Sequence, residues 1–170
     1  MCDLPHYVRQ DAPIFAGMHD ITVLIVDDDP LCLEEQAELL TSLGLSCLTA
    51  GSADAALAMI DDDIDINIVV IDIYMPAHNG LWLLRQLQQR RDAGRNISAL
   101  LISGHMSLDC AVSGLRHDAC DCLTKPVASH DFAGAIARIA ARTRRMTNGQ
   151  LSRQLSLIHD GVRWIAEQFG

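Results

Sequence analysis

The feature that most constrains this chain is a regular alternation of short apolar runs with helical patterns. Runs suited to strands occupy residues 22–26, 45–49, 66–71, 97–102 and 119–124. Strands that alternate with helices pair in parallel and are joined by right-handed crossovers. The chain therefore predicts an α/β fold: a doubly wound, five-stranded parallel sheet of the flavodoxin-like type, with strand order 2-1-3-4-5 and a C-terminal extension helix.

Local signals mark where the helices begin and end. Gly44 follows the first helical pattern, at a position where a left-handed residue commonly ends a helix. Ser52 is suited to cap the second helix, and Ser129 or His130 precedes the last one. The expected helices cover residues 31–43, 53–60, 81–91, 108–116 and about 131–145.

Two segments flank the alternating part, which covers residues 21–145. Residues 1–20 have no clear period and are expected to form an N-terminal arm. Residues 146–170 contain a heptad pattern, and its helix at 148–169 would act as a linker or as a homodimeric coiled coil. A helix that packs its apolar stripe on its own domain fits the same pattern, so both alternatives stay open.

Composition narrows the class of protein. The net charge of −9 argues against a chain built mainly to bind nucleic acid directly. No apolar run approaches the length of a membrane span, and the first residues lack the pattern of a signal peptide. We expect a cytoplasmic protein, without membrane association, whose six cysteines are reduced.

Residues with chemical functions follow four of the predicted strands. They are Asp27 to Asp29, Asp72, Ser103 with Gly104, and Lys125. Because ligands of parallel α/β sheets gather at the carboxyl ends of the strands, we expect these residues to share one edge. Three clustered acids repel one another unless a cation neutralises them, and Mg²⁺ prefers such hard oxygen ligands. Ser103, the Gly104 N–H and Lys125 could then bind phosphoryl oxygens around Asp72.

These segments resemble a known family. Val26-Asp27-Asp28-Asp29-Pro30, Asp72-Ile73-Tyr74-Met75-Pro76 with Gly80, Ser103-Gly104 and Lys125-Pro126 are similar to the receiver domains of two-component response regulators. The resemblance covers about residues 21–145 and depends on separated elements that occur in the right order. It implies a phosphorylation-activated signalling switch, not an enzyme beyond self-catalysed phosphorylation and dephosphorylation.

The resemblance also implies roles for the acids. Asp72 matches the phosphoacceptor, which receives its phosphoryl group from a histidine kinase or a phosphotransfer protein. Asp28 and Asp72 match direct ligands of the Mg²⁺ cofactor, together with the backbone carbonyl of Tyr74. Asp27 matches the outer acid, which often acts through water.

The remaining positions concern the switch. Ser103 matches the hydroxyl residue that moves toward the phosphoryl group, and Lys125 matches the lysine that precedes a cis proline. Cys122 stands where receivers often have a tyrosine or phenylalanine relay, so the usual aromatic switch is in doubt. Tyr74 and His105 match positions that tune the lifetime of the phosphoryl group, and a bulky Tyr74 could shield it from water.

A different class of function is a haloacid-dehalogenase-like phosphatase that uses Asp27 and Asp29. Leu31 stands where that family has a small residue, and no acidic pair follows Lys125 in the expected way. An Asp72→Asn substitution separates the two hypotheses. The chain is expected to be either a stand-alone regulator or the N-terminal receiver of a larger one.

Overall fold

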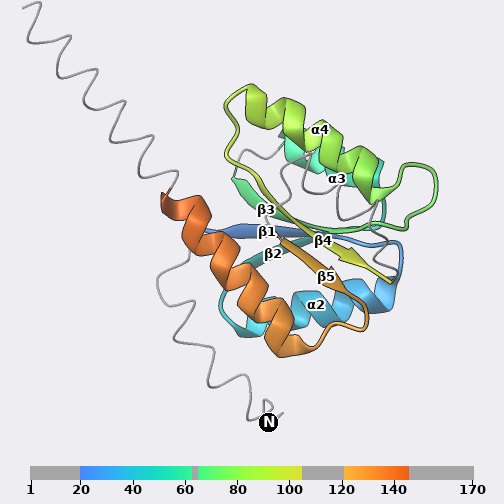
Figure 1. The fold of residues 1–170 in the computed structure, drawn as a ribbon, viewed down its shortest axis with the longest axis vertical. Coiled ribbons are helices and arrows are strands. Elements are labelled where there is room, and N and C mark those ends of the chain that lie inside the picture. Colours follow the sequence, from blue (N-terminus) through green and yellow to red (C-terminus); the bar gives the residue numbers. More distant parts are fainter. Residues whose placement is uncertain (1–19, 63–64, 105–120, 146–170) are drawn as a thin grey trace, which may run out of the picture.

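The computed structural model describes residues 20–62, 65–104 and 121–145 of the chain. Five parallel strands form one sheet in the order β2-β1-β3-β4-β5 (Figure 1). The strands are β1 (Thr22–Val26), β2 (Ser46–Ala50), β3 (Ile66–Asp72), β4 (Ser98–Ser103) and β5 (Asp121–Thr124). The helices are α2 (Pro30–Ser42), α3 (Ala53–Asp62), α4 (Gly80–Asp92) and a helix over residues 129–145.

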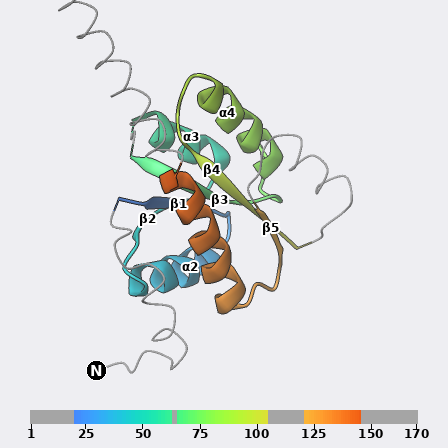
Figure 2. The same cartoon turned by 60° about the vertical axis from the view of Figure 1, so that its left-hand side comes forward.

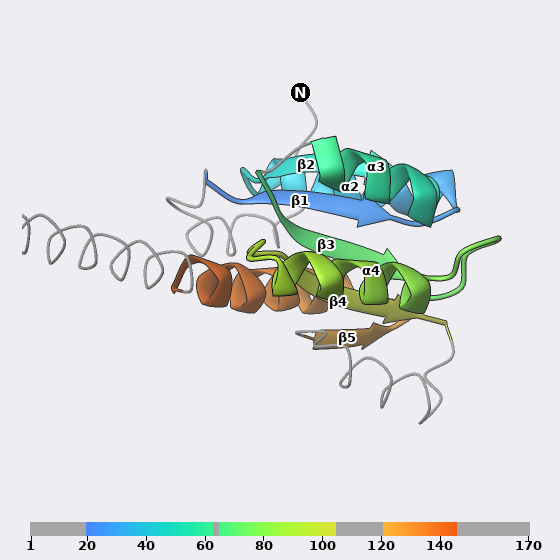
Figure 3. The same cartoon turned by 90° about the horizontal axis from the view of Figure 1, so that it is seen from above.

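Helices cover both faces of the sheet. The two views in Figures 1 and 2 place α2 and the helix at 129–145 on one face, and α3 and α4 on the other. From above, the arrowheads of β1, β3, β4 and β5 point the same way, so these strands end at one edge of the sheet (Figure 3). Because the strands are parallel, every residue that directly follows a strand lies at this edge.

Successive side chains along each strand point to opposite faces of the sheet, so one strand contributes to the hydrophobic core on each face. In β1, Val23 and Ile25 pack with the core under α2, whereas Leu24 and Val26 pack with the core under α3 and α4. All but one residue of β3 are buried, which is typical of a central parallel strand. The inner strands have continuous apolar runs because their side chains are buried on both faces of the sheet.

Short-range signals place the ends of two helices. Gly44 has a φ of +86°, which is the left-handed conformation expected after α2. The Ser52 hydroxyl accepts a hydrogen bond from the backbone N–H of Ala55 at 3.2 Å, as expected for the cap of α3. The last helix already includes Ser129, because the carbonyl of Ala128 accepts the first N–H groups of its opening turn.

The predicted fold class and the strand order 2-1-3-4-5 are confirmed. The described elements begin and end within two residues of the expected positions, a difference that is usual between hydrogen-bond definitions and sequence patterns. The expected helix at 108–116, the arm at 1–20 except Asp20, and the heptad helix at 148–169 lie outside the described residues. Within the described ranges, no helix combines the length and apolarity needed to cross a bilayer.

Candidate functional site at the carboxyl edge of the sheet

The register of the strands brings the predicted residues to one place. Val26 pairs with Ile71, so Asp27, the residue after β1, comes to lie beside Asp72, the last residue of β3. Farther along the sheet, Ser103 pairs with Thr124, and Lys125 follows directly. The carboxyl ends of β1, β3, β4 and β5 therefore bring these residues to the same edge of the sheet.

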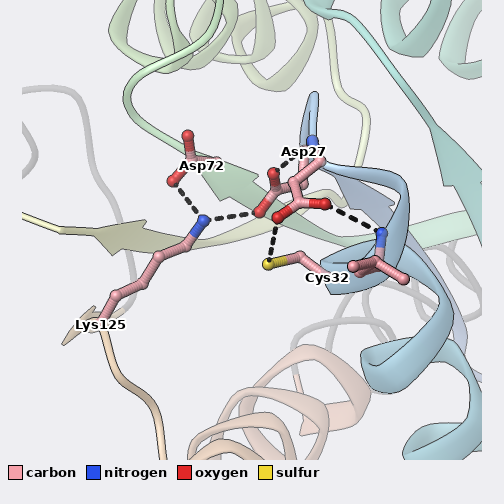
Figure 4. Close-up of polar contacts among 6 residues, drawn as sticks. Asp27, Cys32, Asp72 and Lys125 are labelled. Carbon is pink, nitrogen blue, oxygen red and sulfur yellow. Dashed lines mark hydrogen bonds and ion pairs between the residues drawn. The ribbon is translucent and has the colours of Figure 1, made fainter.

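Lys125 is the centre of the polar contacts. Its Nζ lies 2.7 Å from Oδ2 of Asp27 and 3.0 Å from Oδ1 of Asp72 (Figure 4). Asp27 and Asp72 are only 3% and 5% exposed, whereas the lysine side chain keeps 29% of its surface. The ammonium thus joins two buried carboxylates that would otherwise repel each other.

Backbone hydrogen bonds hold these side chains in position. The N–H of Asp27 donates to the carbonyl of Ala50 at 3.2 Å, and its Oδ1 accepts from the N–H of Asp29 at 2.9 Å. The N–H of Lys125 donates to the carbonyl of Ser103 at 2.8 Å. The Lys125–Pro126 peptide bond is cis, as the resemblance implied.

Asp72 is fixed by the close approach of the next helix. The N–H of Gly80 donates to the carbonyl of Ile73 at 3.0 Å, which closes the loop after β3 onto the start of α4. A Cβ atom at Gly80 would lie 2.3 Å from the carbonyl oxygen of Asp72 and 2.9 Å from the Cα of Ile73. Glycine is therefore required here because the backbones touch.

The electrostatics of the crevice favour an added cation. Burial raises the pKa of Asp72, and the hydrogen bond and charge of Lys125 offset this only in part. Burial by itself lowers the pKa of Lys125, but its hydrogen bonds to Asp27 and Asp72 outweigh that effect and raise it. With Asp28 included, three carboxylates face one ammonium, so two negative charges stay uncompensated when all are ionised.

The acids fit a divalent metal ion. One carboxylate oxygen from each of Asp27, Asp28 and Asp72 can be chosen so that all three lie within 4.8 Å of one another. Asp28 is exposed, so an ion bound there could keep water ligands. A hard donor set with a surplus of two negative charges suits Mg²⁺ better than softer metals, which prefer sulfur or imidazole.

Other predicted residues occupy varied positions. Ser103 is completely buried at the end of β4, and a Cβ at Gly104 would meet no atom within 4 Å. Tyr74 is 54% exposed in the loop after β3. Cys122 is partly buried against the core under α3 and α4, where burial raises the pKa of its thiol. His105 lies outside the described residues.

Sequence analysis missed a group beside the site. His78, in the loop after Asp72, contacts Asp54 in the first turn of α3 and stacks on Trp82 of α4. Asp54 and His78 are 24 positions apart, one in α3 and the other in the loop between β3 and α4. The position of His78 between the predicted phosphoacceptor and the next helix was the one available signal, and it did not indicate the partner.

The pattern of residues matches a known family model. The model described as "Response regulator receiver domain" matches residues 23–137. The two-component response regulator PprB of Pseudomonas aeruginosa is 30% identical over 146 residues, which cover 86% of this chain and 52% of that protein. The transcriptional regulatory protein MalR of Bacillus subtilis is 32% identical, over 79% of this chain and 59% of MalR. The chain thus spans about half the length of these curated relatives.

Solved structures give the same result. A CheY-like response regulator receiver domain protein from Methanospirillum hungatei is 26% identical with a TM-score of 0.68, and the alignment covers 74% of this chain and 97% of that one. The crystal structure of FixJ-N is 33% identical with a TM-score of 0.64, and the alignment covers 72% of this chain and 95% of that one. The alternative phosphatase finds no support in these similarities. Asp29, its expected second acid, instead caps α2 by accepting the N–H of Leu31 at 3.0 Å.

Proposed function

Because the chain belongs to the family of response regulator receiver domains, we propose that it is a signalling switch that accepts a phosphoryl group on Asp72. The observation that carries this proposal is the double contact of Lys125 with Asp27 and Asp72, at 2.7 and 3.0 Å, beside a third acid. The donor is a histidine kinase or a phosphotransfer protein, as it is for the family.

The proposed reaction is an in-line transfer. An Oδ atom of Asp72 attacks phosphorus, an O–P bond forms, and the N–P bond to the donor imidazole breaks with its electron pair returning to nitrogen. Asp27, Asp28, Asp72 and the Tyr74 carbonyl would hold Mg²⁺, which neutralises phosphoryl oxygens. The rate gain comes mainly from positioning and from charge neutralisation.

Lys125 and the residues at the end of β4 are proposed to bind the phosphoryl group once it is on Asp72. In this proposal the Lys125 ammonium exchanges part of its contact with Asp72 for a phosphoryl oxygen. The Ser103 hydroxyl and the N–H of Gly104 donate to the other oxygens, so that Ser103 shifts on phosphorylation. Cys122 stands at the position of the usual aromatic relay. We expect the change to reach a partner through the face made by the predicted helix at 108–116, β5 and the helix at 129–145.

A small phosphodonor tests the proposal. Incubation with acetyl phosphate and Mg²⁺ should add the mass of one phosphoryl group to the wild type and none to Asp72→Asn, read by intact mass spectrometry. Asp121→Asn is the matched control, because it removes a carboxylate from β5 outside the crevice and should leave labelling unchanged. Labelling of the Asp72→Asn variant to the wild-type extent would refute the assignment.

Tyr74 is proposed to govern how long the phosphoryl group survives. Its side chain is large, exposed and two residues beyond Asp72, so it can cover the acyl phosphate against water. Tyr74→Asn should speed dephosphorylation, measured as loss of the added mass after removal of the phosphodonor. An unchanged rate would contradict this role.

The architecture outside the described residues remains a prediction. We propose a cytoplasmic regulator in which residues 146–170 link the receiver to an output or dimerise through 148–169. Comparing the molar mass in solution of the whole chain and of a chain truncated after Arg145 tests dimerisation. We expect no direct nucleic-acid contact by the receiver because of its negative charge, although the relative MalR is by name a transcriptional regulator.

A further inference from the structure

Two carboxylates of α3 contact residues of α4 and of the loop that precedes it. In the last turn of α3, both oxygens of Asp61 accept hydrogen bonds from Arg90 of α4 at 2.6 Å. In the first turn, Asp54 contacts His78, which precedes α4. Since α3 follows the carboxyl end of β2, Asp54 lies toward the edge that carries the acids, and Asp61 lies toward the opposite edge.

His78 belongs to the segment that leads away from Asp72. Residues 73–79 connect β3 with α4, and five of them, Tyr74 and residues 76–79, are exposed. The start of the segment is held by the N–H of Ile73, which donates to the carbonyl of Ile102 at 2.9 Å. Its end is held by Asn79, whose side chain accepts the N–H of Trp82 at 2.9 Å. In between, the backbone N–H of Tyr74 donates to the Asp72 carboxylate and Met75 is buried in the core. The contacts of His78 hold the exposed part that follows.

The His78 ring is fixed from two sides. Its Nδ1 lies 3.0 Å from each oxygen of Asp54, and because an ionised carboxylate only accepts, Nδ1 carries the hydrogen and donates it. The ring also stacks on Trp82, with centroids 3.9 Å apart and an angle of 12° between the planes. The exposed segment is thereby attached to both α3 and α4.

We propose that His78, oriented by Asp54 and Trp82, is a positioning residue that holds the segment after Asp72 in its metal-binding shape. This inference rests on the proposed function, in which the Tyr74 carbonyl is a ligand of the ion. Three residues lie between Tyr74 and His78, so release of His78 loosens the part of the segment that follows this carbonyl and lets the carbonyl turn away from the carboxylates. Metal binding must then also order this segment, and the free-energy cost of that ordering lowers the affinity for the ion.

Metal binding without a phosphodonor gives the direct readout. Mn²⁺ shares the preference of Mg²⁺ for hard oxygens, and electron paramagnetic resonance counts the free ion. His78→Ala and Asp54→Ala should each weaken Mn²⁺ binding by roughly threefold to tenfold, at or below the lower end of losses seen for outer-shell partners. Asp54→Asn keeps an oxygen that accepts the Nδ1 hydrogen, so it should stay within about twofold of wild type.

Asp61→Ala is the matched control. It also removes an exposed carboxylate that ties α3 to the next unit, but at the far end of the helix. The replaced side chains of Asp54, His78 and Asp61 are 60%, 46% and 51% exposed, so each variant should stay folded with a urea midpoint close to that of wild type. Only His78→Ala and Asp54→Ala should clearly shift the Mn²⁺ titration, and phosphorylation of these two variants by acetyl phosphate should recover when Mg²⁺ is raised to saturation.

The outcomes separate the two proposals. If the wild type binds Mn²⁺ and labels Asp72, but His78→Ala and Asp54→Ala bind Mn²⁺ as well as wild type does, the positioning role is wrong. Equal weakening by Asp61→Ala would also overturn it, because general loosening of α3 would then explain the effect. If the wild type neither binds the ion nor takes up a phosphoryl group, the proposed function itself fails.

Discussion

Replacement of Asp72 by asparagine should stabilise the metal-free fold at neutral pH. Asp72 is 5% exposed, and its burial raises its pKa above the ordinary value of 3.8 despite the contact with Lys125. A raised pKa means that the folded state binds the proton more tightly than the unfolded state does. The stability that Asp72 contributes is fully present below 3.8 and is lost as pH rises through its folded-state pKa.

The size of the effect follows from the charge balance of the crevice. Asparagine keeps the shape and an oxygen that can accept from Lys125, but it leaves two carboxylates facing the ammonium instead of three. We expect Asp72→Asn to unfold with a free energy about 0.5–2 kcal/mol larger than wild type at pH 7, the usual gain when an unfavourable functional position is relaxed. Mg²⁺ at 100 times its Kd stabilises a protein by about 2.7 kcal/mol, so the ion should reverse the ranking.

Urea unfolding followed by circular dichroism measures this directly. The two proteins are compared with EDTA at several pH values from 7 down toward 4, and at pH 7 with Mg²⁺. The advantage of Asp72→Asn should shrink steadily as the pH falls, because wild-type Asp72 becomes protonated in the folded state. A wild type that is the more stable protein in EDTA at pH 7, or an advantage that does not change with pH, would refute the electrostatic argument.

Three further substitutions have defined consequences for urea unfolding. Lys125→Met should lower the free energy of unfolding in EDTA by about 1–3 kcal/mol. This is less than the roughly 3–5 kcal/mol expected when a fully buried ion pair is broken, because the lysine is partly exposed. Mg²⁺ should stabilise the variant more than it stabilises wild type. Gly80→Ala should cost about 1–3 kcal/mol and slow phosphorylation, because the added Cβ would lie 2.3 Å from the Asp72 carbonyl oxygen. Thr143→Val should cost about 1–3 kcal/mol, since it leaves the buried Ser98 hydroxyl without its partner at 2.8 Å, and the double variant with Ser98→Ala should cost less than the sum of the single ones.

The order of chemical residues along the chain was sufficient to locate the site. Apolar runs alternate with helical patterns, and this periodicity is a local property of the sequence. Once strands are parallel and crossovers right-handed, the residue after every strand must emerge at the same edge. Asp27, Asp72, Ser103 and Lys125 could therefore be assigned to one edge before any distance was known, and in the tertiary structure Lys125 contacts both Asp27 and Asp72.

Contacts between units were decided by the tertiary structure alone. The pairing of Asp54 with His78 depends on how α3 packs beside the loop after β3, and the pairing of Ser98 with Thr143 depends on where the last helix crosses β4. Nothing in the local sequence encodes these relations, because each side chain has suitable polar chemistry for many partners. They arise from the register of the strands and from the fit of apolar side chains between helix and sheet, which only the folded chain as a whole determines.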